Sequence, residues 1–259
     1  MTYKCIFSDI DGTLLNSKNE VSSITKKKIK QLNEEGIPFV LVSARMLKGM
    51  DFIQREIEVK APMICYSGAI VYDEDYNIIY SQGFSVEKAK EIHQFIQENY
   101  HFPISIYYEN HWCTDYVDAG IQLESEITGI IPEPLDYSSI SIVHKILLIS
   151  SPENINSIEK ELKEKYADLN IYKSKPTYLE IMDASVLKSK AITYLCEQKE
   201  IPLSETLSFG DNYNDVDMLK TTGMGFAMGN APEGVLNQVQ NHTLSNDENG
   251  IVYALEHLL

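Results

Sequence analysis

The sequence of 259 residues has few cysteines, few positive charges and no long apolar run. Its four cysteines stand far apart, without a C-x-x-C pair or a Cys/His cluster, which excludes the common structural zinc sites. No apolar run approaches the roughly 18 residues that a membrane helix needs. An acidic motif begins within nine residues of the first methionine, which leaves no room for a signal peptide. We therefore expect a protein of the reducing cytoplasm.

Positive charge is scarce relative to negative charge. The chain has 22 Lys and Arg against 38 Asp and Glu, a formal net charge of −16. A surface this acidic repels nucleic acids and anionic membranes, so we expect neither as a partner. A phosphorylated substrate would need local positive charge or a metal ion to enter. The sequence carries no signal for an oligomeric state.

Two carboxylates directly follow the first apolar segment. Cys5-Ile6-Phe7 predicts a buried strand, and Ser8-Asp9-Ile10-Asp11-Gly12-Thr13-Leu14 comes next. Two Asp side chains this close repel each other, and the arrangement is least unfavourable when a cation or a shared proton lies between them. Gly12 lets backbone N–H groups approach an anion without a Cβ in the way. The plain alternative is an acidic turn, because Asp-Gly is a common turn pair.

The order of the expected elements indicates a core interrupted by an insertion. Residues 1–82 begin with alternating strands and helices, the pattern of a parallel sheet with helices on both faces, and end in a hairpin. Residues 83–185 mix strands and helices without strict alternation, which favours a separate α+β domain. Strands and helices alternate again in 186–259. We predict an α/β fold: a Rossmann-like parallel-sheet core from 1–82 and 186–259, with an inserted α+β domain.

Polar residues stand where the expected core strands end or the core helices begin. They form four sets: Asp9 with Asp11, Ser43, Lys188, and Asp211 with Asn214 and Asp215. Since the carboxyl ends of parallel strands lie at one edge of a sheet, we expect the four sets to converge. Carboxylates gathered there demand a divalent cation, and oxygen ligands suit a hard ion such as Mg²⁺. With Lys188, Ser43 and the Gly12 backbone, the cation would hold a phosphate dianion. One carboxylate would then attack phosphorus and another would move a proton.

These sets resemble the four motifs of the haloacid dehalogenase-like superfamily. The insertion resembles the cap domain of the Cof-type sugar-phosphate phosphatases. Segments 226–231 and 249–250 are similar as well, so the resemblance spans essentially the whole chain.

The resemblance implies a role for each matching residue. Asp9 would be the nucleophile and Asp11 the general acid and base. Mg²⁺ would be held by Asp9, by the backbone carbonyl of Asp11 and by Asp211. Asp215 would either support the metal site or orient Lys188. Ser43 and Lys188 would bind the phosphate, with Asn214 close by.

Three departures from the superfamily pattern stand out. The second motif is Ser43-Ala44-Arg45 where relatives often have Thr-Gly-Arg, and Ser43 keeps the hydroxyl. Ser67 stands where relatives often have Asn, so no contact of that Asn is expected here. Ser189 replaces a Gly that often follows the lysine. None of these removes a group that the chemistry needs. Arg45 either bridges core and cap or is a surface charge, and the sequence leaves both alternatives open.

The predicted activity is Mg²⁺-dependent hydrolysis of a small phosphate monoester through an aspartyl-phosphate. By resemblance, the substrate is a small phosphorylated metabolite, either a sugar phosphate or a phosphorylated cofactor. A sugar phosphomutase or phosphotransferase on the same core is the enzymatic alternative, and a catalytically silent ligand sensor is the other. The intact acidic motifs and Lys188 favour a hydrolytic enzyme.

Overall fold

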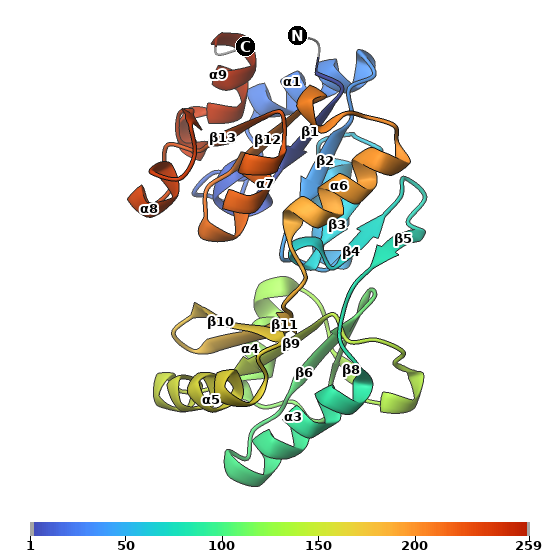
Figure 1. The fold of residues 1–259 in the computed structure, drawn as a ribbon, viewed down its shortest axis with the longest axis vertical. Coiled ribbons are helices and arrows are strands. Elements are labelled where there is room, and N and C mark those ends of the chain that lie inside the picture. Colours follow the sequence, from blue (N-terminus) through green and yellow to red (C-terminus); the bar gives the residue numbers. More distant parts are fainter. Residues whose placement is uncertain (1–2, 258–259) are drawn as a thin grey trace. The chain divides into compact units, whose positions relative to one another are not determined.

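The computed structural model describes residues 3–257 and divides the chain into two units (Figure 1). The first unit is Met1–Ser81 with Leu187–Leu259, and the second is Gln82–Val186. The ends of the predicted core, residues 1–2 and 258–259, lie outside the described range. The predicted limits of the insertion, 83 and 185, fall one residue inside each limit of the second unit.

The first unit is built on an eight-stranded sheet. Its strands are β1 Cys5–Ser8, β2 Phe39–Val42, β3 Met63–Cys65, β4 Ile70–Tyr72, β5 Ile78–Ser81, β12 Thr206–Gly210, β13 Met224–Ala227 and β14 Asn241–His242. The order is β14-β13-β12-β1-β2-β3-β4-β5, and neighbours from β14 to β3 are parallel. The pairs β3–β4 and β4–β5 are antiparallel, so the expected hairpin closes one edge of the sheet. The strands β1 and β12 are neighbours in the middle of the sheet.

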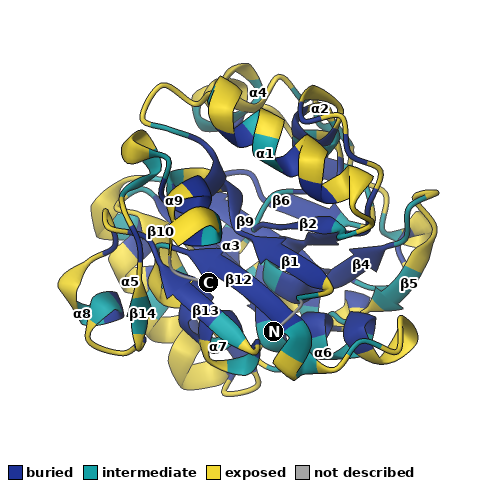
Figure 2. Cartoon of the chain, turned by 90° about the horizontal axis from the view of Figure 1, so that it is seen from above, coloured by how far each residue is buried: buried dark blue, intermediate teal, exposed yellow. Residues whose placement is uncertain are grey.

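Helices cover both faces of this sheet. They are α1 Ser23–Glu34, α2 Lys48–Glu56, α6 Lys188–Gln198, α7 Val216–Thr221, α8 Glu233–Leu236 and α9 Gly250–His257. Figure 2 shows α1 and α9 on one face and α6 and α7 on the other, with the strands between them buried. Every residue of β1 and of β2 is buried. This double coverage explains why these strands are continuous apolar runs in the sequence.

Local sequence sets the ends of several helices. Ser22 begins α1 by accepting the Thr25 N–H on its hydroxyl at 3.2 Å. Gly36 follows the end of α1 with a φ of +77°, a left-handed conformation that glycine adopts without strain. These signals fix where α1 leaves the sheet and where the chain returns to it as β2.

The second unit is a six-stranded sheet with helices packed against it. Its elements are α3 Val86–Asn99, β6 Ser105–Tyr108, β7 His111–Thr114, α4 Ala119–Thr128, β8 Glu133–Pro134, β9 Lys145–Ile149, α5 Pro152–Lys165, β10 Leu169–Lys175 and β11 Tyr178–Asp183. The order is β10-β11-β9-β6-β7-β8, and every pair except β7–β8 is antiparallel. Apolar residues of α3 and α5, among them Ile92 and Ile158, form its core with Ile146 and Ile181. The predicted α+β character of the insertion is confirmed.

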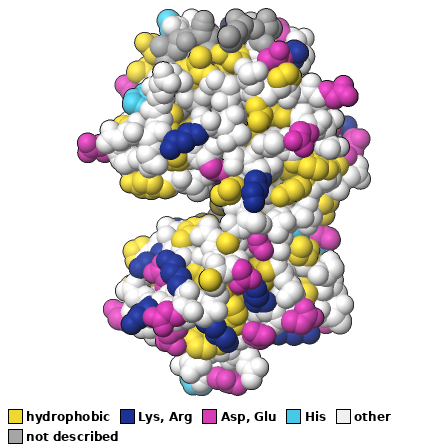
Figure 3. Space-filling view, in the orientation of Figure 1, with side chains coloured by type: hydrophobic (Ala, Val, Ile, Leu, Met, Phe, Trp, Pro, Cys, Tyr) yellow, Lys and Arg dark blue, Asp and Glu magenta, His cyan; other side chains and the backbone are white. Residues whose placement is uncertain are grey.

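Charges of both signs are present on the surface. On the face drawn in Figure 3, Lys and Arg side chains lie among the Asp and Glu side chains. Across the part of the chain that the structure describes, every helix falls short of the length and apolarity needed to cross a membrane.

Candidate active site

The first motif lies at the carboxyl end of β1. Asp9 follows that strand, and its N–H donates to the carbonyl of Phe209 in β12 at 3.0 Å. The chain then makes the turn Ile10–Leu14, which Leu15 closes by donating its N–H to the Ile10 carbonyl at 2.9 Å. Gly12 has a φ of +81°, and a Cβ built on it would lie 2.4 Å from Asp211 Oδ2. Only glycine therefore lets the turn approach Asp211 so closely.

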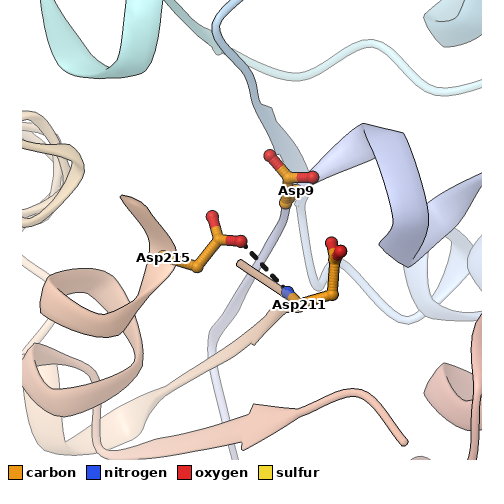
Figure 4. A group of neighbouring side chains, drawn as sticks. All are labelled: Asp9, Asp211 and Asp215. Carbon is orange, nitrogen blue, oxygen red and sulfur yellow. Dashed lines mark hydrogen bonds between the residues drawn. The ribbon is translucent and has the colours of Figure 1, made fainter. Parts of the chain in front are cut away.

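Three carboxylates meet at this edge of the sheet (Figure 4). Asp9 comes from the end of β1, and Asp211 and Asp215 come from the segment after β12. One oxygen of each lies within 4.8 Å of the others. Asp9 and Asp215 are buried and Asp211 is half-buried. Such a set of hard oxygen ligands fits a divalent metal ion. The side chain of Asp11, whose predicted metal contact is its backbone carbonyl, does not belong to this cluster.

Lys188 lies between two of these carboxylates. Its Nζ is 2.5 Å from Asp9 Oδ1 and 2.6 Å from Asp215 Oδ1. It also donates to the Val42 carbonyl at the end of β2, at 3.4 Å. Burial by itself would lower the pKa of Lys188, but the carboxylates of Asp215 and Asp9 outweigh burial and raise it. The ammonium group therefore stays charged and brings positive charge to an acidic centre.

Asp215 uses both of its oxygens within the protein. Oδ1 contacts Lys188, and Oδ2 accepts the N–H groups of Asp211 at 3.0 Å and Asn212 at 2.9 Å. These three contacts leave Asp215 fewer free lone pairs for a metal ion than Asp211 has, whose side chain accepts the Thr13 hydroxyl. Of the two roles left open for Asp215, the geometry favours orienting Lys188 and the Asp211 backbone.

While the protein holds no cation, the pKa values of the other two carboxyls of the cluster are raised. Burial, the largest influence, raises the pKa of Asp9 well above its usual value, with Lys188 opposing and Asp215 adding to the shift. Burial likewise raises the pKa of Asp211 to about 6, against the hydrogen bond from Thr13. That bond runs from Thr13 Oγ1 to Asp211 Oδ1 at 2.7 Å. A cation between Asp9 and Asp211 would favour their charged forms, so this donor set is matched to a metal-bound state.

Asp11 is held by Arg45. Arg45 Nε donates to Asp11 Oδ2 at 2.9 Å, and Nη2 donates to Asp11 Oδ1 at 2.5 Å. The third nitrogen, Nη1, donates to the Gly49 carbonyl in α2 at 3.3 Å. Neither alternative for Arg45 in the sequence interpretation anticipated this partner. The side chain fixes the orientation of the expected general acid and base.

Ser43 lies at the carboxyl end of β2 and is almost fully buried. Its Oγ accepts the Arg45 N–H at 3.2 Å, and its carbonyl accepts the Ser67 N–H at 2.8 Å. Ser67 has a left-handed φ of +53°. Asn tolerates this left-handed conformation better than Ser does. Asn214 is exposed in the turn Tyr213–Asp215, beside Asp215.

Comparison with known proteins places this site in a family. Residues 6–255 match the sequence pattern of the family of haloacid dehalogenase-like hydrolases. The chain belongs to this family. A Haemophilus influenzae protein named "Putative phosphatase" is 35% identical over 258 residues, which cover 99% of this chain and 98% of the relative. A Bacillus subtilis protein named 5-amino-6-(5-phospho-D-ribitylamino)uracil phosphatase YwtE is 26% identical over 286 residues. The match covers 99% of this chain and 98% of the B. subtilis protein.

The fold is found among solved structures as well. A haloacid dehalogenase-like hydrolase from Bacteroides thetaiotaomicron matches with a TM-score of 0.90 and 29% identity, covering 100% of both chains. The predicted family, the fold class and the assignment as a phosphatase are confirmed. The buried aspartate cluster fits the divalent metal that such chemistry requires.

Proposed function

We propose that this phosphatase hydrolyses small phosphate monoesters with the help of Mg²⁺ and through an aspartyl-phosphate on Asp9. The observation that carries the proposal is the position of Asp9. It is buried at the end of β1, beside Asp211, and Lys188 contacts its Oδ1 at 2.5 Å. That contact leaves Oδ2 as the oxygen that can attack phosphorus.

The residues around Asp9 divide into a metal-binding and a phosphate-binding group. Asp9, Asp211 and the backbone carbonyl of Asp11 would hold Mg²⁺, and Asp215 would keep Lys188 in place. The ion would neutralise the approaching phosphate dianion. Lys188, Ser43 and the Gly12 backbone, with Asn214 close by, would bind the phosphate oxygens. This assignment explains why a lysine stands within the cluster of acids.

The proposed reaction takes two steps. In the first, a bond forms between Asp9 Oδ2 and phosphorus while the ester bond to the leaving oxygen breaks, and Asp11 gives that oxygen a proton. In the second, the Asp11 carboxylate takes a proton from water as the water oxygen bonds to phosphorus and the bond between phosphorus and Asp9 Oδ2 breaks. Inorganic phosphate leaves, and both aspartates return to their starting states.

Phosphate on a small polyol or sugar is the substrate class that we favour. The name of the B. subtilis relative gives its substrate as a phosphoribityl compound, in which phosphate is esterified to a sugar-alcohol chain. Sugar phosphates and phosphorylated cofactors share this alkyl phosphate group. Alkoxides leave poorly without a proton, which matches the placement of Asp11 two positions after Asp9 in the chain.

A screen of phosphorylated metabolites with Mg²⁺ tests the proposal. The wild-type protein should release inorganic phosphate from several alkyl phosphates, and Asp9→Asn, which keeps the shape of the side chain, should release none. Formation of an isomeric sugar phosphate in place of free phosphate would indicate a mutase. Turnover by Asp9→Asn within tenfold of wild type would exclude the covalent step.

A further inference from the structure

The turn that carries Asp11 is fastened by a segment near the end of the chain. Asn230 Nδ2 donates to the Gly12 carbonyl at 2.8 Å, and Asn230 Oδ1 accepts the N–H of Asn246 at 3.0 Å. Asn246 in turn donates its Nδ2 to the Leu15 carbonyl at 2.8 Å. The carbonyls of Gly12 and Leu15 thus accept hydrogen bonds from Asn230 and Asn246. These two asparagines lie 218 and 231 positions later in the chain.

The bond from Asn230 sets the direction of one peptide group. Because a peptide is planar, the direction of the Gly12 carbonyl also fixes the Thr13 N–H, which points the opposite way. On its other side the same turn is held by Asp211, which receives the Thr13 hydroxyl at 2.7 Å. Gly12 itself, lacking a Cβ and with φ of +81°, has more freedom to rotate than any other residue would have. The hydrogen bond from Asn230 therefore restrains the backbone rotation of Gly12, the most flexible residue of the turn.

Asn230 is itself anchored by backbone packing. The N–H of Gly229 donates to the Leu244 carbonyl at 3.0 Å. A Cβ on Gly229 would lie 2.9 Å from the backbone nitrogen of Ser245, so the two segments meet backbone to backbone. Asn230 is exposed and adds little to the apolar core. Its short amide supplies one donor for Gly12 and one acceptor for Asn246, a pair that carboxyl and hydroxyl side chains of this length do not provide in the same way.

We propose that Asn230 is a positioning residue of this enzyme. It holds the Gly12 peptide, and with it the turn between Asp9 and Asp211, in the orientation that phosphoryl transfer needs. It acts through the turn and touches neither the substrate nor the reacting atoms. The inference rests on the proposed function of Asp9, Asp11 and Gly12.

Four variants test the inference. Asn230→Ala removes both bonds of the amide, and Asn230→Asp removes the donor to Gly12 while keeping the acceptor for Asn246. Asn246→Ala removes the bond to Leu15 but leaves the Asn246 N–H in place. Asn237→Ala changes another exposed asparagine, at the end of α8, and serves as the control.

Kinetics with p-nitrophenyl phosphate give the first readout. Asn230→Ala and Asn230→Asp should lower kcat and kcat/KM together by about tenfold, the value of one ordinary hydrogen bond, with KM near that of wild type. Asn246→Ala should lose less, and Asn237→Ala should match wild type. A lower midpoint of thermal unfolding with unchanged kcat at 25 °C would make the role structural and overturn the inference. So would a loss confined to Asn230→Asp that disappears at high salt, since that is an effect of charge.

Hydrogen exchange gives a readout that does not depend on activity. Amides of residues 10–15 should exchange faster in Asn230→Ala than in Asn237→Ala or wild type, measured by mass spectrometry without substrate. Unchanged exchange would overturn the inference. An inactive wild-type protein with the expected exchange difference would instead refute the proposed function and leave the restraint of the turn standing.

Discussion

Arg45 engages both oxygens of Asp11 at once, through Nε at 2.9 Å and Nη2 at 2.5 Å. A two-pronged pair of this kind fixes the plane of the carboxylate as well as its distance. Each Asp11 oxygen keeps a second lone pair beside its bond to Arg45, so the pair still leaves a site that can carry a proton. The pair thereby holds the Asp11 carboxyl in one orientation for the proton transfers proposed above.

Removal of the guanidinium should therefore reduce turnover through Asp11. We expect Arg45→Ala to lower kcat/KM for an alkyl phosphate by about tenfold, a part of the roughly 10²–10⁴-fold that acid–base catalysis supplies. Arg45→Lys keeps the charge but lacks the fork, so it should recover only part of the loss. The measurement is a double-mutant cycle with Asp11→Asn. Losses that simply add in the double variant would show that Arg45 acts independently of Asp11.

Stability provides the control for this variant. The side chains of Arg45 and Asp11 are 30% and 55% exposed, and exposed ion pairs stabilise folding by about 1 kcal/mol at most. The midpoint of thermal unfolding of Arg45→Ala should stay close to that of wild type. A large drop in that midpoint would assign Arg45 a structural role.

Loss of Lys188 should affect both stability and activity. Lys188→Met keeps much of the buried stem but leaves Asp9 and Asp215 without their counter-ion. An uncompensated buried charge destabilises a fold by roughly 3–5 kcal/mol. We expect a large drop in the free energy of unfolding, measured by denaturant titration, together with loss of phosphatase activity.

A second substitution tests the cause of that drop. Asp215→Asn removes one of the two carboxylates that lose their counter-ion in Lys188→Met. The double variant Lys188→Met with Asp215→Asn should therefore be more stable than Lys188→Met alone. Activity should not return, because the phosphate still lacks its ammonium partner. Equal stability of the single and double variants would contradict the charge argument.

The pKa of Asp211 makes stabilisation by metal depend on pH. In the metal-free fold this pKa is about 6, against about 3.9 for Asp in an unfolded chain. Because the folded state holds the extra proton, the contribution of Asp211 to stability is present below about pH 4 and is lost as pH rises through about 6. Mg²⁺ needs the charged carboxylate, so its effect should appear over the same interval.

Thermal unfolding with and without Mg²⁺ measures this effect. Mg²⁺ should raise the unfolding midpoint clearly at about pH 7.5 and only slightly at about pH 5. Asp211→Asn should show little rise at either pH. A Mg²⁺ effect that is the same at both values in the wild-type protein would exclude Asp211 as a ligand whose protonation competes with metal.

The sequence predicted the core well because its signals are local. The run Phe39–Val42 after Pro38 is buried on both faces, and its four consecutive apolar residues predict this burial. In the second unit, His111–Thr114 shows no apolar alternation from which the strand β7 could be predicted. It becomes a strand through pairing with β6, where the Trp112 ring stacks on Tyr107 at 5.8 Å and Nε1 donates to Ser105. These contacts exist only once the unit is folded.

In the site, too, local features could be predicted and contacts between distant residues could not. The sequence identified Asp9, Lys188 and Asp211 because each belongs to a motif at the end of a strand or the start of a helix. It did not reveal which partner a side chain takes when that partner is far away in the chain. Arg45 lies 34 positions from Asp11, and Asn230 lies 218 positions from Gly12. Such pairs follow from the return of the chain to one edge of the sheet, which no local pattern encodes.

Asp11→Asn should separate the two chemical steps according to the leaving group. The proposed metal contact of Asp11 is its backbone carbonyl, so Mg²⁺ binding should survive the substitution. A sugar alkoxide needs a proton to leave, and its ester should lose most of the roughly 10²–10⁴-fold benefit in the first step. A nitrophenolate leaves with little help, so p-nitrophenyl phosphate should lose the benefit mainly in the second step, when water attacks.

Rapid-mixing kinetics distinguish these two losses. Asp11→Asn should give a burst of nitrophenol close to one per active site, followed by slow turnover, because the aspartyl-phosphate forms and then waits for an unactivated water. Asp75→Asn, at an exposed carboxylate in the turn between β4 and β5, makes the same change of charge away from Asp9 and should behave like wild type. Equal losses for both substrates without a burst would mean that Asp11 does not handle the proton. A burst in Asp11→Asn that is absent from wild type would show that Asp11 assists the attack of water on the aspartyl-phosphate, as the proposed mechanism requires.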